Sequence, residues 1–224
     1  MKCALILVCA GRGRRLKKKT DKSFVRLGKF PLFYYSYSVF RNIKYFSQII
    51  IVSRKKYFPL IKRYTKDRRV FLTTGGLRRQ DSVYKGLLLV KEDIDYVFIH
   101  DGARPFINRA MIGRLKKKVF KYKAVVVGLR INDAVKVVER NIIKHSLERK
   151  NLWYIQTPQV FERKLLSKAY NKFRKFFVYD DSEFIVKLSQ PVKVIEGEFW
   201  NIKVTYPQDL VLARAILKMK KVSS

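Results

Sequence analysis

Residues Cys3-Ala-Leu-Ile-Leu-Val-Cys9 form an uninterrupted apolar run, and Ala10-Gly11-Arg12-Gly13-Arg14-Arg15 follow it directly. A strand that is covered on both faces has such a run, because neither face meets water. In open α/β sheets, ligands bind beyond the carboxyl ends of the strands. We therefore expect the first strand of a parallel sheet, followed by a loop at a ligand site.

Further strands and helices alternate along the rest of the chain. Short apolar segments predict strands at 48–52, 70–72, 96–100, 124–129 and 192–195. Helical spacing predicts helices at 32–46, 55–64, 81–91, 109–121, 162–175 and 181–189, and a last one from about 205, where Thr205, Pro207 and Gln208 suit a capped first turn. This alternation predicts a parallel α/β sheet with helices on both faces.

Residues 131–154 interrupt the alternation. Val135–Glu139, the pair Arg140-Asn141 and Ile142-Ile143 match a β-hairpin with asparagine in its turn. The segment is too long for an ordinary connection, so we expect an arm that meets a second subunit. With 224 residues, the chain suits one α/β domain that spans positions 1–224.

The charge balance is extreme, with 51 Lys+Arg against 17 Asp+Glu and a formal net charge of +34. Such a chain attracts polyanions, and a nucleic-acid-binding function is one interpretation. The basic residues are spread along the whole chain, which favours a compositional drift and only non-specific contact with nucleic acid.

The expected compartment is the cytoplasm. Cys3 and Cys9 lie in one apolar run without the spacing of a zinc site or a disulfide framework, which indicates core thiols. No apolar run approaches the roughly 18 residues of a membrane helix. The expected first strand begins almost directly after Met1, so we expect no signal or transit peptide and no contact with a membrane.

The loop after the first strand has the features of a phosphate site. Gly11 and Gly13 let the backbone approach a phosphate chain, and Arg15 and Lys22 would bracket its charge. It is not a Walker loop, since no Gly-Lys-Ser/Thr follows, and Leu16 stands where a dinucleotide fingerprint has its third glycine. The alternative is an ordinary strand-to-helix turn with solvated basic residues.

Three other motifs follow expected strands or precede the last helix. The loop 75–82 joins a glycine pair to Asp81 or Ser82 as helix cap, which suits a polar or anionic ligand but is also an ordinary capped turn. In the segment 100–106, Asp101 can accept hydroxyl hydrogen bonds and Arg104 can hold a phosphate, unless the two form an internal salt bridge. Lys203 near the strand ends is a further candidate, or one more surface lysine.

In order and spacing, these motifs resemble the 2-C-methyl-D-erythritol 4-phosphate cytidylyltransferases of the isoprenoid pathway. The resemblance runs from Ala4 to about Leu217 and includes Asp133–Lys136, Leu152-Trp153 and Gln156–Gln159. It implies a Rossmann-like three-layer sandwich with a mostly parallel sheet, and a protruding β-arm that completes a homodimer. The implied reaction transfers CMP from CTP to the sugar-alcohol phosphate with Mg²⁺ and releases pyrophosphate.

The resemblance also implies residue roles. Arg15 and Lys22 would be catalytic and stabilise charge at the α-phosphorus. The CTP-binding residues would be Cys9, Ala10, Gly11, Gly13, Arg14, Gly76, Leu77 and Ser82. The acceptor would be bound by Asp101, Arg104, Ala134, Lys203 and Arg149, the last reaching the neighbouring subunit's substrate. Mg²⁺ would be held mainly by the phosphates, with Asp101 as the one candidate carboxylate.

The chain departs from the family at three places. Asp21 precedes Lys22 where the family usually has proline, Ala134 replaces a threonine hydroxyl, and Arg78 replaces a common acidic residue. A ribitol-5-phosphate cytidylyltransferase is therefore an alternative, although the Asp133–Lys136 pattern and the 201–203 segment favour methylerythritol phosphate. A nucleic-acid-binding protein on the same fold is the alternative from another class.

Overall fold

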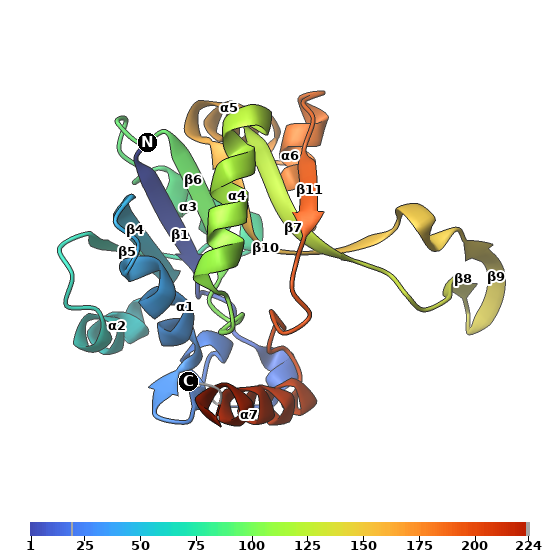
Figure 1. The fold of residues 1–224 in the computed structure, drawn as a ribbon, viewed down its shortest axis with the longest axis horizontal. Helices are drawn as coiled ribbons and strands as arrows, with labels where there is room; N and C mark the ends of the chain where they lie inside the picture. Colours follow the sequence, from blue (N-terminus) through green and yellow to red (C-terminus); the bar gives the residue numbers. More distant parts are fainter. Residues whose placement is uncertain (19, 223–224) are drawn as a thin grey trace.

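A seven-stranded sheet forms the centre of the molecule (Figure 1). The structure, a computed structural model, describes residues 1–18 and 20–222. The strands are β1 (Cys3–Val8), β4 (Phe46–Ser53), β5 (Val70–Thr74), β6 (Tyr96–Asp101), β7 (Ala124–Arg130), β10 (Trp153–Glu162) and β11 (Lys193–Glu196), in the spatial order β11-β7-β10-β6-β1-β4-β5. β10 runs antiparallel to β6 and β7, whereas the other neighbouring pairs are parallel.

Helices cover both faces of this sheet. One core cluster joins the sheet to α1 (Leu32–Arg41), α2 (Phe58–Tyr64) and α4 (Arg109–Tyr122). The cluster on the other face joins it to α3 (Arg79–Leu87), α5 (Arg163–Phe173) and α6 (Ser182–Lys187). The architecture is the Rossmann-like three-layer sandwich expected from the sequence.

β1 has the two-sided burial that its apolar run predicts. Cys3, Leu5 and Leu7 point into one core cluster, and Ala4 and Ile6 point into the other. Successive residues of a strand face opposite sides of the sheet. All five side chains are fully buried, because helices cover both sides. The carboxyl end of β1 is thereby fixed between β4 and β6, where the first glycine loop begins.

A small third cluster closes the end of the sheet at which β1 finishes. The helix α7 (Pro207–Val222) packs there against the segment after β1, which contains the 3₁₀ helices η1 (Arg14–Leu16) and η2 (Lys22–Phe24) and the short strands β2 (Arg26–Leu27) and β3 (Phe30–Pro31). Figure 1 shows α7 lying across this end of the molecule. Among residues 1–18 and 20–222, none of the helices has the length and apolar character needed to cross a membrane.

The hairpin expected between 131 and 154 is present. It consists of β8 (Val135–Glu139) and β9 (Ile142–Leu147), with η4 (Arg149–Asn151) on its return path. Arg140 and Asn141 adopt positive φ angles of 49° and 63°, the left-handed geometry of a two-residue hairpin turn. The hairpin extends away from the sheet as an arm (Figure 1), and its residues are almost all exposed.

Three local expectations were wrong. The first helix ends at Arg41 instead of residue 46, because the Asn42 amide caps the Ser38 carbonyl at 3.0 Å and Phe46 already belongs to β4. The strand β10 was not expected. At the start of α7, the Asp209 carboxylate, and not Gln208, accepts the backbone N–H groups of Thr205 and Tyr206 at 2.7 and 2.8 Å.

Candidate active site

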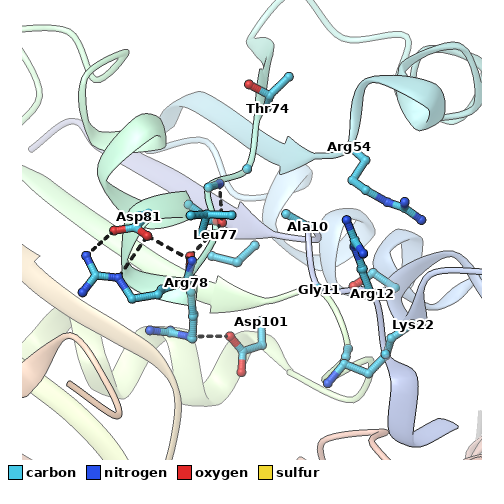
Figure 2. A pocket seen from close by; sticks show the side chains of 18 of the residues that line it. Ala10, Gly11, Arg12, Lys22, Arg54, Thr74, Leu77, Arg78, Asp81 and Asp101 are labelled. Carbon is cyan, nitrogen blue, oxygen red and sulfur yellow. Dashed lines mark hydrogen bonds and ion pairs between the residues drawn. The ribbon is translucent and has the colours of Figure 1, made fainter. Parts of the chain in front are cut away.

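The three loops that follow β1, β5 and β6 meet in space. They line one hollow of about 1180 Å³ at the carboxyl ends of β1, β4, β5 and β6. Figure 2 shows Gly11 and Arg12 on one side, Leu77, Arg78 and Asp81 on the opposite side, and Asp101 between them. The site is therefore at the sheet end where open α/β folds bind ligands.

Glycine is required where the loops close against each other. Gly13 has a φ of +66°, and a Cβ atom there would lie 2.6 Å from the Cβ atom of Lys22. A Cβ atom on Gly75 would lie 2.3 Å from that of Ala10. The backbone of the first loop therefore packs directly against Lys22, and the second loop packs directly against the first.

Positive charge dominates the walls of the hollow. Among the described residues, nine cationic side chains line it against two carboxylates, those of Asp81 and Asp101. The cations are Arg12, Arg14, Lys22, Arg54, Lys55, Arg78, Arg79, Lys85 and Lys203. Such a concentration of one sign in a concave site favours a ligand with several negative charges.

The surroundings of Lys22 shift the pKa of its amine. Burial, followed by the positive charge of Lys203, lowers its pKa to about 8. Asp101 opposes this shift, whereas Arg15 and Arg104 add to it. A bound anion would stabilise the charged form of this amine and raise its pKa, because the negative charge compensates for the hydration that the amine lost on burial.

Asp101, at the end of β6, is bound by two cations from distant segments. Lys203 Nζ lies 2.6 Å from its Oδ2 atom, and Arg79 Nε lies 3.2 Å from its Oδ1 atom. Burial opposes ionisation of the carboxyl, but Lys203, Arg79 and Arg104 outweigh it and hold the pKa of Asp101 well below its usual range. Among the described residues, Asp101 forms its ion pairs with these two cations and not with Arg104, so the alternative of an internal Asp101–Arg104 salt bridge is not what the structure has.

Arg79 also binds a second buried carboxylate. Its Nη1 atom lies 2.7 Å from Oδ2 of Asp181, whose Oδ1 atom accepts the Tyr170 hydroxyl at 2.5 Å. Burial disfavours the charged guanidinium, but Asp181 and Asp101 more than compensate and raise the pKa of Arg79. Arg79 thus ties the end of β6 to the start of α6.

Most of the site residues expected from the sequence line the hollow. Those that do are Ala10, Gly11, Gly13, Arg14, Lys22, Gly76, Leu77, Ser82, Asp101 and Lys203. Cys9 does not line the hollow: it is fully buried beneath Gly102, and its backbone N–H donates to the Val52 carbonyl at 2.7 Å. Within one chain, Ala134 and Arg149 lie on the arm and are not brought to the hollow; the Arg149 guanidinium donates to the Asn132 carbonyl.

Two expected cations point elsewhere. The guanidinium of Arg15 lies 5.4 Å from the ring centroid of Tyr206 and donates to its hydroxyl at 3.3 Å, so it rests against the start of α7. Arg104 donates to the Asn201 carbonyl at 2.7 Å, and its buried Nε atom has no hydrogen-bond partner among residues 1–18 and 20–222. Burial lowers the pKa of Arg104.

Several residues of the hollow were not singled out from the sequence. Arg54 and Lys55 directly follow β4, so the rule that ligands bind at strand ends would have found them. Arg79 lies inside the loop 75–82, but no role was assigned to it from the sequence. Arg78, the departure from the family's acidic residue, pairs with Asp81 and donates to the carbonyls of Arg174 and Lys175, which fixes the end of α5.

The fold and the hollow define an α/β protein that binds a multiply charged anion at the strand ends. The family model for 2-C-methyl-D-erythritol 4-phosphate cytidylyltransferases (IspD) matches residues 3–219 of the chain. The chain belongs to this family and is a cytidylyltransferase.

Similar proteins cover almost the whole chain. Enzymes of this name from Caldanaerobacter subterraneus and Clostridioides difficile are each 36% identical, over 97% of this chain and 100% and 94% of their own lengths. The crystal structure of the 4-diphosphocytidyl-2C-methyl-D-erythritol synthase from Anaerococcus prevotii aligns with a TM-score of 0.85 at 28% identity, covering 97% of this chain and 98% of that one. The Thermus thermophilus cytidylyltransferase aligns with a TM-score of 0.82 at 27% identity, with coverages of 97% and 100%.

Replacing Arg79 is expected to destabilise the fold strongly. Arg79→Met leaves the buried carboxylates of Asp101 and Asp181 without this partner, which should lower the free energy of unfolding by about 3–5 kcal/mol. Urea unfolding followed by circular dichroism measures the change. Arg78→Met is the matched control, because its side chain is 38% exposed and its loss should cost far less. Equal losses in the two variants would contradict the role given to Arg79.

Proposed function

We propose that the chain transfers a CMP group from CTP to 2-C-methyl-D-erythritol 4-phosphate and releases pyrophosphate. The observation that carries this proposal is the cationic hollow formed by three separated loops in a chain of this family. An oxygen of the acceptor phosphate attacks the α-phosphorus of CTP and forms the new P–O bond. The bond between the α-phosphorus and the bridging oxygen breaks, and pyrophosphate carries away its electron pair.

The main physical difficulty of this reaction is the meeting of two anions. The attacking oxygen is already negative, so the transfer needs no covalent enzyme intermediate and no general base. Catalysis then consists of positioning and of stabilising charge on the phosphoryl oxygens. We assign this role to Lys22 from inside the hollow and to Arg15, which would have to leave the ring of Tyr206 to reach the α-phosphate.

The two glycine loops would divide the nucleotide between them. Gly11, Gly13 and Arg14 would bind the triphosphate through backbone N–H groups and a guanidinium. The backbone of the second loop at Gly76 and Leu77, with Ser82 and with the backbone near Ala10 where the two loops meet, would bind cytosine. The hydroxyl of Ser82 already accepts the Gly76 N–H at 3.0 Å, which shapes this loop before any ligand binds.

The acceptor would lie on the Asp101 side of the hollow. The Asp101 carboxylate can accept its hydroxyl groups, and Lys203 can attract its phosphate. Arg104, which donates to the Asn201 carbonyl, would have to turn to join it. At the position of Ala134, the methyl group cannot donate a hydrogen bond, so this contact would be weaker than one from threonine. Ala134 and Arg149 would serve a site only from the arm of a neighbouring subunit.

The carboxylates of the hollow fit a magnesium ion that arrives with the nucleotide better than a resident ion. Asp81 is paired with Arg78, and Asp101 with Lys203 and Arg79. No group of three or more His, Cys, Asp or Glu residues within positions 1–18 and 20–222 could hold a metal ion. Asp101 would be the candidate protein ligand for Mg²⁺, and the ion would reduce the negative charge of the triphosphate.

The alternatives receive less support. Ribitol 5-phosphate would place a similar phosphate in the hollow, and only a comparison of acceptors can separate the two. For the nucleic-acid-binding alternative, the net charge is the main argument, whereas family membership and the cationic hollow at the strand ends favour the enzyme. We also propose a cytoplasmic location, which fits the free thiols of Cys3 and Cys9.

Pyrophosphate release tests the proposed function. We expect turnover with CTP, Mg²⁺ and 2-C-methyl-D-erythritol 4-phosphate, and a much lower kcat/KM with ribitol 5-phosphate or with ATP, GTP or UTP. Higher efficiency with ribitol 5-phosphate would contradict the acceptor assignment. Absence of turnover, combined with RNA binding that weakens steeply as salt rises, would contradict the enzyme.

Lys22→Ala should lower kcat by about 10²–10³-fold and change the KM for CTP much less, as expected for the loss of a transition-state donor. Lys62→Ala, at an exposed position of α2, is the control and should leave both constants unchanged. Because the pKa of Lys22 is lowered to about 8, its amine is charged below that pH and neutral above it. Wild-type kcat/KM should therefore fall as pH rises through about 8.

The pH dependence gives this assignment a second test. In Lys22→Arg the charge persists at alkaline pH, so the fall near pH 8 should disappear even if the absolute rate is lower. A fall near pH 8 that is the same in Lys22→Arg would contradict the assignment.

We also propose that the arm forms a homodimer. Val138, Ile142, Ile143 and Leu147 expose large apolar side chains on it, and such a patch is typical of an interaction surface. Replacing Ile142 and Ile143 together by Asp should convert a dimer into a monomer of 26.6 kDa in light scattering, and lower turnover because Arg149 could no longer reach a partner's site. Leu88→Asp, at an exposed apolar position of the main body, is the control. A wild-type chain that is monomeric at micromolar concentration and fully active would contradict this arrangement.

A further inference from the structure

Asp21 is a buried carboxylate directly before Lys22. Its side chain is 3% exposed, and it precedes the 3₁₀ turn η2 that carries Lys22. The backbone N–H of Asp21 donates to the Tyr57 hydroxyl at 2.8 Å, and its carbonyl accepts the N–H of Phe24 at 2.8 Å. A buried negative charge on the residue that precedes Lys22 needs a partner of its own, since it would otherwise be free to compete with the substrate phosphates for Lys22.

Arg54 is that partner. Its Nε atom donates to Oδ2 of Asp21 at 2.5 Å, and its Nη2 atom donates to Oδ1, so the pair is bidentate. Arg54 directly follows β4 and precedes η3 (Lys55–Tyr57), so the pair ties the Lys22 turn to the end of a central strand. A bidentate arginine–carboxylate pair fixes orientation as well as distance.

Aromatic packing reinforces the same connection. The ring of Tyr57 stacks on that of Phe24 with centroids 3.9 Å apart and an interplanar angle of 7°. Phe24 ends the turn that Lys22 begins, and Tyr57 ends the 3₁₀ helix that Arg54 precedes. Gly13 also packs against Lys22. The position of Lys22 is therefore set by contacts with two other segments of the chain.

Arg54 also lies in the wall of the hollow. Its side chain is 36% exposed, and Figure 2 shows it beside Arg12, on the same side of the hollow as Lys22. The charges that act on Lys22 come from Lys203, Asp101, Arg15 and Arg104. The positive and negative charges of Arg54 and Asp21 largely cancel at Lys22 because the two groups are in contact.

We propose that Arg54 is a positioning residue for the transfer reaction, acting through Asp21. It holds the turn that carries Lys22 against the end of β4 and keeps the Asp21 carboxylate from pairing with the Lys22 amine. Asp21 stands where the family usually has proline. The ion pair between Asp21 and Arg54 therefore fixes the turn in place of a conformationally rigid residue. The inference rests on the proposed function for its kinetic test only.

A double-mutant cycle tests the pair. Arg54→Gln leaves the buried Asp21 carboxylate free to bind Lys22, so kcat/KM for CTP should fall about tenfold or more, the size of effect that a misplaced catalytic group produces. Adding Asp21→Asn to Arg54→Gln removes that carboxylate and should restore activity to within about threefold of wild type, the non-additivity expected of contacting residues. Additive losses in the double variant would overturn the proposal.

The fall of kcat/KM at high pH, the alkaline limb of the pH profile, distinguishes a positioning role of Arg54 from a role in folding. In Arg54→Gln, the unpaired Asp21 carboxylate favours the charged amine, so the limb should move to higher pH. In Asp21→Asn, the unpaired Arg54 guanidinium disfavours the charged Lys22 amine, so the limb should move to lower pH. The double variant should return close to wild type. A limb that stays in place, or moves in one direction in both single variants, would overturn the proposal.

The Asp67–Arg69 pair supplies the matched control. It is also bidentate and partly buried, with Arg69 Nη2 lying 2.7 Å from Asp67 Oδ2, but neither residue lines the hollow. Asp67→Asn and Arg69→Gln should lower the melting temperature without moving the alkaline limb. Similar kinetic effects from both pairs would indicate a general loss of folding and overturn the positioning role.

Calorimetric titration of CTP with Mg²⁺ in the absence of acceptor gives a second readout that does not depend on turnover. The pH at which CTP affinity falls should shift with the same signs in the same variants. A wild-type enzyme that binds CTP but turns over no acceptor would refute the proposed function while leaving this test of the pair intact. Unchanged pH dependence of CTP binding in both single variants would overturn the inference itself.

Discussion

The site depends on the buried carboxylate of Asp101, which is held between Lys203 and Arg79. Without that negative charge, these two cations from distant segments would face each other at close range and repel. With it, the end of β6 is joined to α3, to the segment before α7 and, through Arg79, to the start of α6. The stability of the fold and the concentration of positive charge around the hollow therefore have a common origin, since the carboxylate that stabilises the cations also forms part of the wall that binds the ligand.

Much of the fold could be predicted, because a strand that is buried on both faces has an uninterrupted run of apolar residues in the sequence. The run from Cys3 to Cys9 predicted a central strand, and the structure divides its side chains between two core clusters. β10 could not be found in this way. Its buried Gln156 and Gln159 are stabilised by hydrogen bonds to Glu198, Asn201 and Asp181. Such partners are far away in the chain, and the local sequence gives no indication of them.

The candidate site could be located from the sequence, but the direction of individual side chains could not. Glycine loops after expected strands identified the hollow, because strand ends converge in a parallel sheet. That Arg15 rests on Tyr206 depends on how α7 packs, which no local pattern determines. The strand-end rule could have placed Arg54 at the hollow, but its pairing with Asp21 could not be predicted, for a similar reason. Its importance follows from contact with a buried Asp21, and an arginine beside an aspartate in space leaves no mark at either position when 33 residues separate them.

The depressed pKa of Lys22 has a thermodynamic consequence for ligand binding. Close to pH 8, about half of the Lys22 amines carry no proton, because the pKa there is about 8. A polyanion binds the protonated form more tightly, so its arrival draws protons from the solution. Nucleotide association and proton uptake are thus one coupled equilibrium, and the heat released on binding will vary with the ionisation enthalpy of the buffer that supplies the proton.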